Sequence, residues 1–207
     1  MPSDVVVHVV DDDEAVRASL SFLLRTANLD VKTYDSASAL LNAPPSSGCV
    51  ITDVRMPDVS GIELLRRLRE LQVAVPVIVI TGHGDVPLAV EAMKLGASDF
   101  LEKPFDEDAL LASVRAAFRR AEQDTHREAE RAELKERVAH LSHREREVLD
   151  GLVAGYPNKT IAYDLGISPR TVEIYRANLM TKMKASSLSE LVRMALIAGL
   201  LGEPASR

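Results

Sequence analysis

The sequence predicts an α/β unit built on a five-stranded parallel sheet, followed by a smaller all-α unit of four helices. Over the first 121 residues, short apolar runs alternate with helical patterns, which is typical of parallel strands joined by crossover helices. The runs at 5–10 and 76–80 are apolar at nearly every position, as expected of strands that helices cover on both faces. After residue 140 only helical patterns remain, so the second unit is expected to be all-α.

The bounds of the first unit's elements follow from these runs and from the residues that interrupt them. Strands are expected near 5–10, 31–34, 49–52, 76–80 and 98–101, and helices near 14–27, 36–42, 61–72, 85–95 and 106–121. Pro57 and Gly61 break the chain after the third strand, and Gly82 and Gly84 do so after the fourth. We therefore divide the chain into residues 1–121, a helical linker at 122–140 and residues 141–207.

The predicted linker has neither glycine nor proline and is dominated by charged residues. We expect the last helix of the first unit to continue through it as an exposed helix. Leu134, Val138 and Leu141 recur at helical spacing, which leaves two interpretations open. The segment is either a solvated tether or a short coiled-coil contact between two subunits.

In the second unit, helices are expected near 142–154, 158–165, 169–184 and 188–198. Two of them begin with capping-box spacing, in which a serine and a glutamate three residues later satisfy each other's backbone amide. The pairs are Ser142 with Glu145, and Ser187 with Glu190.

Bulk composition is that of an ordinary globular protein, with 46% hydrophobic and 27% charged residues. No apolar run approaches the roughly 18 residues needed to span a bilayer, and the N-terminus lacks the basic and apolar segments of a secretory signal. The single cysteine, Cys49, lies in a strand-like run, where we expect a buried side chain rather than a reactive thiol. One cysteine allows no internal disulfide. We therefore expect a cytoplasmic protein with no membrane partner.

Charge is unevenly spread along the chain. Residues 1–121 hold 12 Lys+Arg and 18 Asp+Glu, residues 122–140 hold 4 and 6, and residues 141–207 hold 9 and 7. An acidic first unit thus precedes a mildly basic second one. The overall acidity argues against indiscriminate binding of nucleic acid, but it leaves room for a local basic surface near the C-terminus.

Polar side chains lie at the carboxyl ends of four predicted strands, which share the sheet edge where ligands bind in open α/β folds. These residues are Asp11 and Asp12 after the first strand, Asp53 after the third, Thr81 after the fourth, and Lys103 after the fifth, with Phe100 at the rim. Any single aspartate in such a place is more simply a helix cap. The joint occurrence of three carboxylates, a hydroxyl and an ammonium instead predicts a site for a divalent cation and a phosphoryl group.

Each residue type in this cluster suits that chemistry. Mg²⁺ prefers oxygen ligands, which the carboxylates of Asp12 and Asp53 and the backbone carbonyl of Arg55 can supply, with Asp11 holding a coordinated water. A carboxylate can also act as a nucleophile and form an aspartyl phosphate. Lys103 and Thr81 then offer an ammonium and a hydroxyl donor to phosphoryl oxygens.

The motifs around these residues resemble the receiver domain of response regulators, which act in two-component signalling. The resemblance covers about residues 4–121, and its motifs are Val10-Asp11-Asp12-Asp13, Thr52-Asp53-Val54-Arg55-Met56-Pro57, Ile80-Thr81-Gly82 and Phe100-Leu101-Glu102-Lys103-Pro104. It implies a flavodoxin-like sheet, a sensor histidine kinase as phosphodonor, and a Lys103-Pro104 bond similar to one that is cis in the family.

The resemblance also implies a role for each residue of the cluster. Asp53 takes the place of the phosphoacceptor, Asp11 and Asp12 those of Mg²⁺ ligands, and Thr81 and Lys103 those of the residues that contact the phosphate. Phe100 fits the aromatic switch position, which often carries tyrosine. Because phenylalanine lacks the hydroxyl, any switching must come from ring packing alone.

Among response regulators, the sequence resembles the FixJ type. The matching stretches are Val7-His8-Val9-Val10-Asp11-Asp12, Val79-Ile80-Thr81-Gly82-His83-Gly84-Asp85-Val86-Pro87, Ala89-Val90-Glu91-Ala92-Met93-Lys94 and Glu102-Lys103-Pro104-Phe105. This resemblance implies that phosphorylation makes the face of the fourth helix, fifth strand and fifth helix, including Val90 and Lys94, pair with its copy. It also implies activation of genes for low-oxygen or nitrogen-fixing metabolism.

In the second unit, a short helix, a turn at residues 166–168 and a longer helix have helix-turn-helix spacing. Val172, Leu179 and Met183 fall on one face of the longer helix and are expected in the core. The candidate DNA contacts are Lys159, Arg170, Thr171, Glu173, Arg176, Ala177, Asn178 and Lys182. Arginine can pair with guanine and asparagine with adenine. The spacing alone leaves open a plain helical module with a solvated polar face.

Residues 141–198 resemble the LuxR-type helix-turn-helix, which favours DNA binding. The matching stretches are Leu141-Ser142-His143-Arg144-Glu145-Arg146-Glu147-Val148-Leu149, Asn158-Lys159-Thr160-Ile161-Ala162, Ile167-Ser168-Pro169-Arg170-Thr171-Val172-Glu173 and Glu190-Leu191-Val192-Arg193. Tyr175, where histidine is usual, and Pro157 depart from the pattern.

The two units together predict a phosphorylation-controlled transcriptional activator rather than an enzyme, with Mg²⁺-dependent autophosphorylation and autodephosphorylation only. Its expected partners are a sensor histidine kinase, double-stranded DNA, RNA polymerase and, when phosphorylated, a second copy of the chain. One rival is an aspartate-nucleophile phosphohydrolase, which usually needs a second acidic residue where this chain has Arg55. Another is a phosphorylation-controlled adaptor whose helical unit binds protein instead of DNA.

Overall fold

In the computed structural model, the chain divides into two compact units, Met1–Gln123 and Asp124–Arg207. The structure describes residues 6–82 and 86–200. Among these residues, no helix combines the length and the apolar character that a membrane crossing requires.

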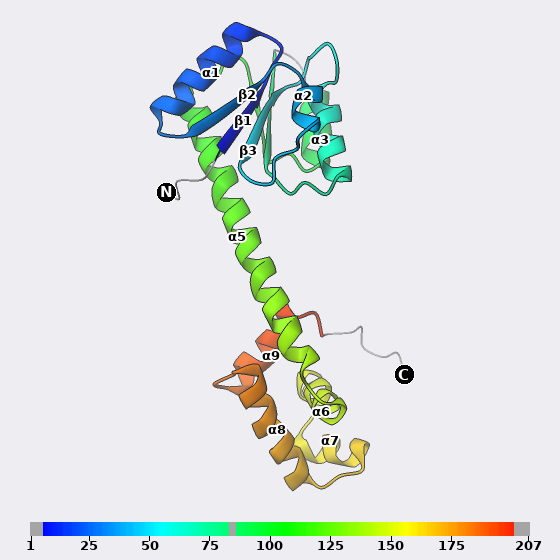
Figure 1. The fold of residues 1–207 in the computed structure, drawn as a ribbon. Helices are drawn as coiled ribbons and strands as arrows, with labels where there is room; N and C mark the ends of the chain where they lie inside the picture. The colour runs from blue at the N-terminus through cyan, green and yellow to red at the C-terminus, as the bar shows by residue number, and fades with distance from the viewer. Residues whose placement is uncertain (1–5, 83–85, 201–207) are drawn as a thin grey trace. The chain divides into compact units, whose positions relative to one another are not determined.

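The first unit is a parallel sheet with helices on both faces (Figure 1). Its strands are β1 (Val6–Val10), β2 (Asp30–Tyr34), β3 (Cys49–Asp53), β4 (Val77–Thr81) and β5 (Asp99–Glu102). Its helices are α1 (Glu14–Thr26), α2 (Ala37–Leu41), α3 (Gly61–Glu70), α4 (Val86–Lys94) and the first part of α5 (Glu107–Ala139). The strands pair in the order β2-β1-β3-β4-β5. The predicted five-stranded parallel sheet is therefore confirmed.

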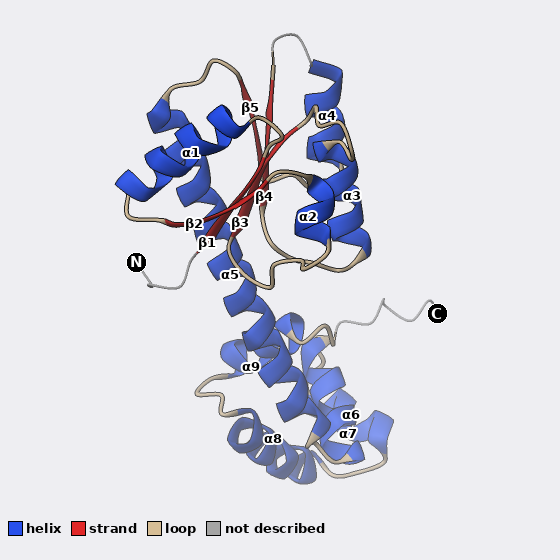
Figure 2. Ribbon diagram, turned by 45° about the horizontal axis from the view of Figure 1, so that its top comes forward, coloured by secondary structure: helices blue, strands red, loops and turns tan. Residues whose placement is uncertain are grey.

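Helices α1 and α5 cover one face of the sheet, and α2, α3 and α4 cover the other (Figure 2). Because successive residues of a strand point to opposite faces, each strand contributes to both cores. In β4, Ile78 and Ile80 pack with α1 and α5, whereas Val77 and Val79 pack with the other three helices. All four side chains are at most 1% exposed, which explains why this run is apolar at every position.

Cys49, at the start of β3, is fully buried in the core beneath α1 and α5. Burial raises the pKa of its thiol well above the ordinary value, so the reactive thiolate is scarce at neutral pH. The expectation of a buried, hydrophobic cysteine is confirmed.

The second unit holds the four predicted helices after α5. They are α6 (His143–Val153), α7 (Asn158–Leu165), α8 (Pro169–Met183) and α9 (Leu188–Ile197). The predicted capping box of Ser142 and Glu145 is present at the start of α6. At α9 only half of the box forms: Ser187 accepts from the Glu190 N–H, but the Glu190 carboxylate accepts from the N–H and hydroxyl of Ser186 instead.

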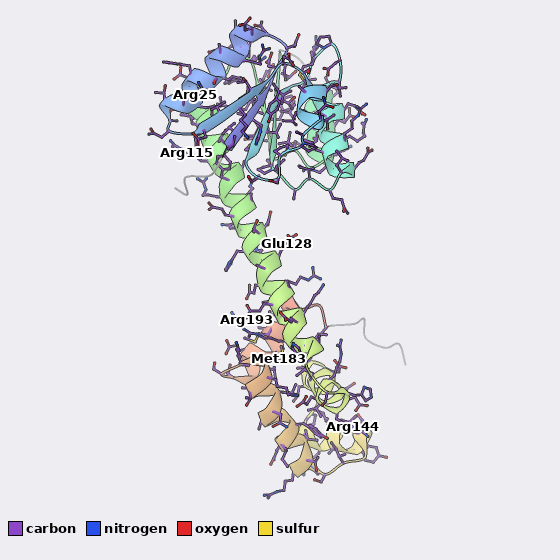
Figure 3. The ribbon with its side chains drawn as sticks, viewed as in Figure 1. Arg25, Arg115, Glu128, Arg144, Met183 and Arg193 are labelled. Atoms are coloured by element: carbon purple, nitrogen blue, oxygen red, sulfur yellow. The ribbon has the colours of Figure 1, made fainter. Side chains whose placement is uncertain are left out.

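The end of α5 is neither a tether nor a seam between subunits. The expected continuation of the helix through 122–139 is confirmed, and residues 122–133 are exposed, as Glu128 shows in Figure 3. Leu134 and Val138, however, are each 4% exposed and lie in the core of the second unit. Leu141 packs against the same core. Both interpretations of this apolar spacing are wrong, because these side chains belong to a core that the other helices of the second unit complete.

His8, in β1, is a buried histidine held on both ring nitrogens. Its Nε2 lies 3.3 Å from the carbonyl oxygen of Ser47, and its Nδ1 lies 3.1 Å from the hydroxyl of Tyr34. A neutral ring that donates from Nε2 and accepts at Nδ1 satisfies both contacts. Burial lowers the pKa of His8 below its ordinary value of 6.5; the charge of Lys32 acts in the same direction, and the Ser47 hydrogen bond opposes both.

We expect the first unit to lose stability as the pH falls below 6.5, because the unfolded chain binds the His8 proton more tightly than the folded one. His8 can change the free energy of unfolding by at most about 1.4 kcal/mol per pH unit. The free energy of unfolding, measured with urea at several pH values, should depend less steeply on pH in His8→Gln than in the wild type. The matched control is His126→Gln, an exposed histidine on α5. Equal slopes for His8→Gln and the wild type would contradict the expectation.

Candidate functional site

Asp53 is the last residue of β3, and both of its carboxylate oxygens accept hydrogen bonds. Oδ1 accepts from Lys103 Nζ at 2.6 Å, and Oδ2 accepts from the backbone N–H of Arg55, also at 2.6 Å. The next residue, Val54, donates its N–H to the carbonyl oxygen of Ile80 at 2.8 Å, so the sheet ladder fixes the backbone just beyond Asp53. The side chain of Asp53 is 12% exposed, so it remains reachable from the sheet edge.

Asp11, just after β1, is the second acidic member of the site. It is 3% exposed; its Oδ2 lies 3.4 Å from Lys103 Nζ, and its Oδ1 accepts from the Asp13 N–H at 2.9 Å. Burial raises the pKa of the Asp11 carboxyl and the charge of Asp53 adds to the increase, while the Asp13 N–H and Lys103 partly offset it. A cation beside this buried carboxylate is therefore stabilising.

Lys103 joins the two carboxylates. Its backbone N–H donates to the carbonyl oxygen of Thr81 at 2.8 Å, which ties the end of β5 to the end of β4. Burial alone would lower the pKa of the ammonium, but the hydrogen bond and charge of Asp53 and the charge of Asp11 outweigh it, and the net shift is upward. Lys103 therefore stays charged. The predicted cis bond between Lys103 and Pro104 is present.

The other predicted members of the cluster lie around this triad. Thr81 is the last residue of β4 and is 1% exposed. Phe100 lies opposite Val79 in the sheet and packs, half-buried, against the core beneath α2, α3 and α4. Asp12 is exposed, whereas Asp11 is buried, because consecutive residues leaving a strand point to opposite sides.

Two carboxylates converge in this structure, where the sequence predicts three. Within the described ranges, no three acidic, histidine or cysteine side chains are grouped so as to hold a metal ion. The ammonium of Lys103 instead lies within hydrogen-bonding distance of Asp11 and Asp53, and the exposed side chain of Asp12 does not complete the group.

The simpler interpretation, that these aspartates are helix caps, does not describe Asp11 or Asp53. The cap of α1 is Asp13, whose side chain accepts from the N–H groups of Ala15 and Val16. The cap of α3 is Ser60, which accepts from the N–H of Glu63. The carboxylates of Asp11 and Asp53 therefore face the sheet edge with Lys103 instead of a helix start.

Gly61 supports the site because its lack of a side chain lets α3 begin directly against the backbone of Asp53. The sequence predicted only that it breaks the chain after the third strand. As the first residue of α3, it donates its N–H to the carbonyl oxygen of Val54 at 3.0 Å. A Cβ at this position would lie 2.2 Å from the carbonyl oxygen of Asp53. Any larger residue would therefore press on the backbone of Asp53. The signal in the sequence is a glycine directly after a good capping residue, Ser60, where a turn does not require it.

In the second unit, α7 and α8 form the predicted helix-turn-helix. Helix α7 ends at Gly166, whose φ of 64° is left-handed, and α8 begins after Ser168, which accepts from the N–H of Thr171. The predicted inner face of α8 is confirmed, since Val172, Leu179 and Met183 are fully buried. The exposed candidates for DNA contact are Lys159, Arg170, Glu173, Ala177, Asn178 and Lys182. Thr171 is half-buried, with its hydroxyl 2.8 Å from that of Ser168.

Two of the candidate DNA contacts are already paired inside the unit. Arg176 donates to Asn158 Oδ1 at 2.7 Å, which links α8 to the start of α7. Lys182 donates to Glu145 Oε2 at 2.6 Å. This hydrogen bond lowers the pKa of Glu145, as does the Ser142 N–H in the capping box. A phosphate contact by Lys182 would thus compete with Glu145, and its DNA role stays a prediction.

Ile174 is a residue of α8 that was not among the candidate DNA contacts predicted from the sequence. Its side chain is 57% exposed, although isoleucine is usually buried. It lies four residues after Arg170 and four before Asn178, in the middle of the outward face of the helix. The sequence signal that could have identified Ile174 is an apolar residue among the polar positions of the outward face.

The candidate dimer contacts, Val90 and Lys94, are exposed on α4. Val90 is 49% exposed, and its neighbour Met93 is 50% exposed. This helix therefore presents two large apolar side chains to solvent. The adjoining residues His83, Gly84 and Asp85, which belong to one of the FixJ-like stretches, lie outside the described residues.

Comparisons with known proteins assign a family to each unit. Residues 7–115 match the response regulator receiver domain, and residues 139–195 match the luxR family of bacterial regulatory proteins. The chain is 61% identical over 202 residues to the transcriptional regulatory protein FixJ of Azorhizobium caulinodans, covering 97% of this chain and 96% of that protein. It is 47% identical over 191 residues to the response regulator protein TodT of Pseudomonas putida, covering 91% and 84%.

Solved structures show the same similarity over both units. Full-length FixJ from B. japonicum has a TM-score of 0.60 and 55% identity, with 96% of this chain and 99% of that chain covered. The response regulator StyR has a TM-score of 0.76 and 40% identity, with 92% and 98% covered.

Proposed function

The chain belongs to the response-regulator family and joins a receiver domain to a LuxR-type DNA-binding domain, and we propose that phosphoryl transfer from a sensor histidine kinase to Asp53 controls its binding to specific DNA. The observation that carries the proposal is the contact of one ammonium, Lys103 Nζ, with Asp53 at 2.6 Å and Asp11 at 3.4 Å. The contact supports the proposal, because a carboxylate that can act as a nucleophile and a cation that can bind phosphate would then lie together at one sheet edge.

In the proposed reaction, a carboxylate oxygen of Asp53 attacks the phosphorus of a phosphohistidine. A P–O bond forms while the P–N bond breaks, and the leaving imidazole nitrogen keeps the electron pair and takes up a proton. Lys103 offers its ammonium to a phosphoryl oxygen, and Thr81 offers its hydroxyl as a donor. Phe100 is proposed to respond through ring packing.

The residues present fit a hard divalent cation such as Mg²⁺. The donors they offer are all oxygens: the converging carboxylates of Asp11 and Asp53, the backbone carbonyl of Arg55 and, from the exposed side chain beside them, the carboxylate of Asp12. Two of these carboxylates already lie within hydrogen-bonding reach of a single cationic atom, Lys103 Nζ. When bound, the ion would offset the repulsion between the carboxylates and the charge of the incoming phosphoryl group.

Phosphorylation is proposed to pair two receiver domains through α4, where Val90 and Lys94 are exposed. A dimer presents two copies of α8 to paired half-sites on DNA, which compensates for the weak binding of one small module. As an activator, the protein would then engage RNA polymerase in the bacterial cytoplasm. The similarity to proteins named FixJ supports target genes of low-oxygen or nitrogen-fixing metabolism.

Selection from a randomised duplex pool tests this function. The full chain, with Mg²⁺, is incubated with and without acetyl phosphate, and bound duplexes are sequenced. We expect the phosphodonor to enrich duplexes with two related half-sites and to tighten their binding at least about tenfold, through pairing of the two modules. Absence of enrichment in both arms would favour the adaptor, and sustained turnover of acetyl phosphate or another small phosphate ester would favour the phosphohydrolase.

We expect Ile174 to contribute to sequence reading through an apolar contact with a thymine methyl group. Replacing each thymine of the selected duplex in turn by deoxyuracil removes only that methyl. At one position per half-site, this should weaken wild-type binding about fourfold, from roughly 0.8 kcal/mol per buried methyl. Ile174→Ala should bind the two duplexes equally well. Equal sensitivity of the variant and the wild type at every thymine would contradict this role.

A further inference from the structure

The carboxyl end of the helix proposed to read DNA is bound by a side chain from another helix. The last four carbonyls of a helix have no partner within it. At the end of α8, Arg137 of α5 donates from Nη1 to the carbonyl oxygen of Met183 at 2.8 Å. The contact joins residues 46 positions apart, and a guanidinium also complements the partial negative charge of a helix C-terminus.

Arg137 is itself held in place. Its other terminal nitrogen, Nη2, donates to Glu133 Oε1 at 2.6 Å, one turn earlier on α5. The side chain of Arg137 is 20% exposed, whereas that of Glu133 is 60% exposed. The residues on either side of Arg137 on the inner face, Leu134 and Val138, are buried in the second unit's core. The guanidinium is therefore fixed both by packing of its helix and by a carboxylate.

Both ends of α8 have local caps, but its carboxyl end also has a contact from a distant part of the chain. Its start is set locally by the turn and by Ser168. At its other end, the left-handed cap at Lys184 closes the last turn, with the N–H groups of Lys184 and Ala185 donating to the carbonyl oxygens of Thr181 and Met180. Helix α5 adds the contact to the carbonyl oxygen of Met183. Because α8 is a single helix of 15 residues, a shift at its end would also displace its outward residues. These include Asn178, which lies about one and a half turns before the bonded carbonyl.

We propose that Arg137 is a positioning residue for DNA recognition, and that the DNA-binding module begins within α5 near Leu134. The inference rests on the proposed DNA-binding function. The matched LuxR-type segment starts at residue 139 and so leaves out Arg137, Glu133 and Leu134. In this arrangement α5 supplies part of the core beneath the reading helix and a hydrogen bond to its last carbonyl oxygen.

The test compares Arg137→Ala with Arg127→Ala in the full chain, on the duplex selected with acetyl phosphate and on an unrelated duplex. Arg127 lies on the same helix and is 76% exposed, so both variants lose one positive charge. We expect Arg137→Ala to bind the selected duplex about tenfold more weakly than Arg127→Ala, as for loss of one charge-assisted hydrogen bond. Binding to the unrelated duplex should fall equally in both variants. Arg137→Lys, which keeps a charged donor, should recover part of the loss.

Hydrogen exchange gives a readout that needs no DNA. Arg137→Ala should speed amide exchange in the last turn of α8, and Arg127→Ala should leave it unchanged. If Arg137→Ala does not fold, Arg137→Gln takes its place. Equal binding of the selected duplex by the Arg137 and Arg127 variants, or equal exchange, would overturn the proposal. Faster exchange in a protein that selects no DNA would instead overturn the proposed function and leave the helix contact standing.

Discussion

Asp53→Asn is expected to abolish labelling of the protein by acetyl phosphate, measured as the mass gain of one phosphoryl group. The amide is a poor nucleophile and cannot form the acyl phosphate that a carboxylate forms. Lys103 keeps a partner in Asp11, at 3.4 Å, so the variant should remain folded. Removing one of two neighbouring carboxylates also relieves repulsion between like charges. The expected loss is therefore chemical rather than structural.

The matched control for this variant is Asp58→Asn. Asp58 lies in the same loop after β3, is exposed, and accepts from the N–H of Ser38 at 3.0 Å. Asp58→Asn makes the same chemical change at a position away from Lys103, so acetyl phosphate should still label this variant. Full labelling of Asp53→Asn would end the assignment of Asp53 as phosphoacceptor. A label that moves to Asp11 in that variant would show that the ammonium, rather than one particular carboxylate, selects the reacting group.

Leu134→Ala is expected to lower the free energy of unfolding of the second unit by about 2–5 kcal/mol. Leu134 is 4% exposed and lies in one core with Val148, Leu149 and Leu191. The truncation removes buried methyl groups and leaves a cavity that the surrounding helices fill only in part. Chemical denaturation of the full chain, followed by far-UV circular dichroism, measures the effect.

Glu130→Ala is the control for Leu134→Ala. Glu130 lies one turn earlier on α5 and is exposed, so its change should remain within about 0.5 kcal/mol. If Leu134 belonged to a solvated tether, the two variants would behave alike. If it belonged to a seam between subunits, its effect would depend on protein concentration. A loss that is large and independent of concentration supports the assignment of this turn of α5 to the second unit's core.

The strands and helices could be predicted from the sequence because their signals are local. Continuous apolar runs such as Val77–Ile80 mark strands buried on both faces, and every described strand lies within one residue of its predicted bounds. Ser142 and Glu145 mark a helix start through contacts between residues three apart. The sheet edge that brings Asp11, Asp53 and Lys103 together follows from parallel topology, in which the carboxyl ends of the strands share one side.

The features missed from the sequence depend on how side chains pack and point, which local patterns do not fix. Leu134 and Val138 show helical spacing, but spacing alone does not identify the surface against which they pack. Glu190 satisfies the capping-box pattern, yet its carboxylate binds Ser186 instead of Ser187, because side-chain rotamers decide between neighbouring donors. Asp12 has the same chemistry as Asp11, and only the direction in which the chain leaves β1 separates an exposed carboxylate from a buried one.

By itself, the sequence determined the order of elements, the presence of an α/β part before an all-α part, the inner face of α8, and the positions of Asp11, Asp53, Thr81 and Lys103 at the strand ends. The tertiary structure alone decided that Lys103 lies between two carboxylates rather than beside three, and that Arg176 and Lys182 bind Asn158 and Glu145. It also decided that α5 ends inside the second core, with Arg137 on the last carbonyl of α8. The physical reason is distance along the chain. Periodicity and capping act within a few residues, whereas the partner of a charged side chain or of an apolar stripe is fixed only when segments tens of residues apart pack together.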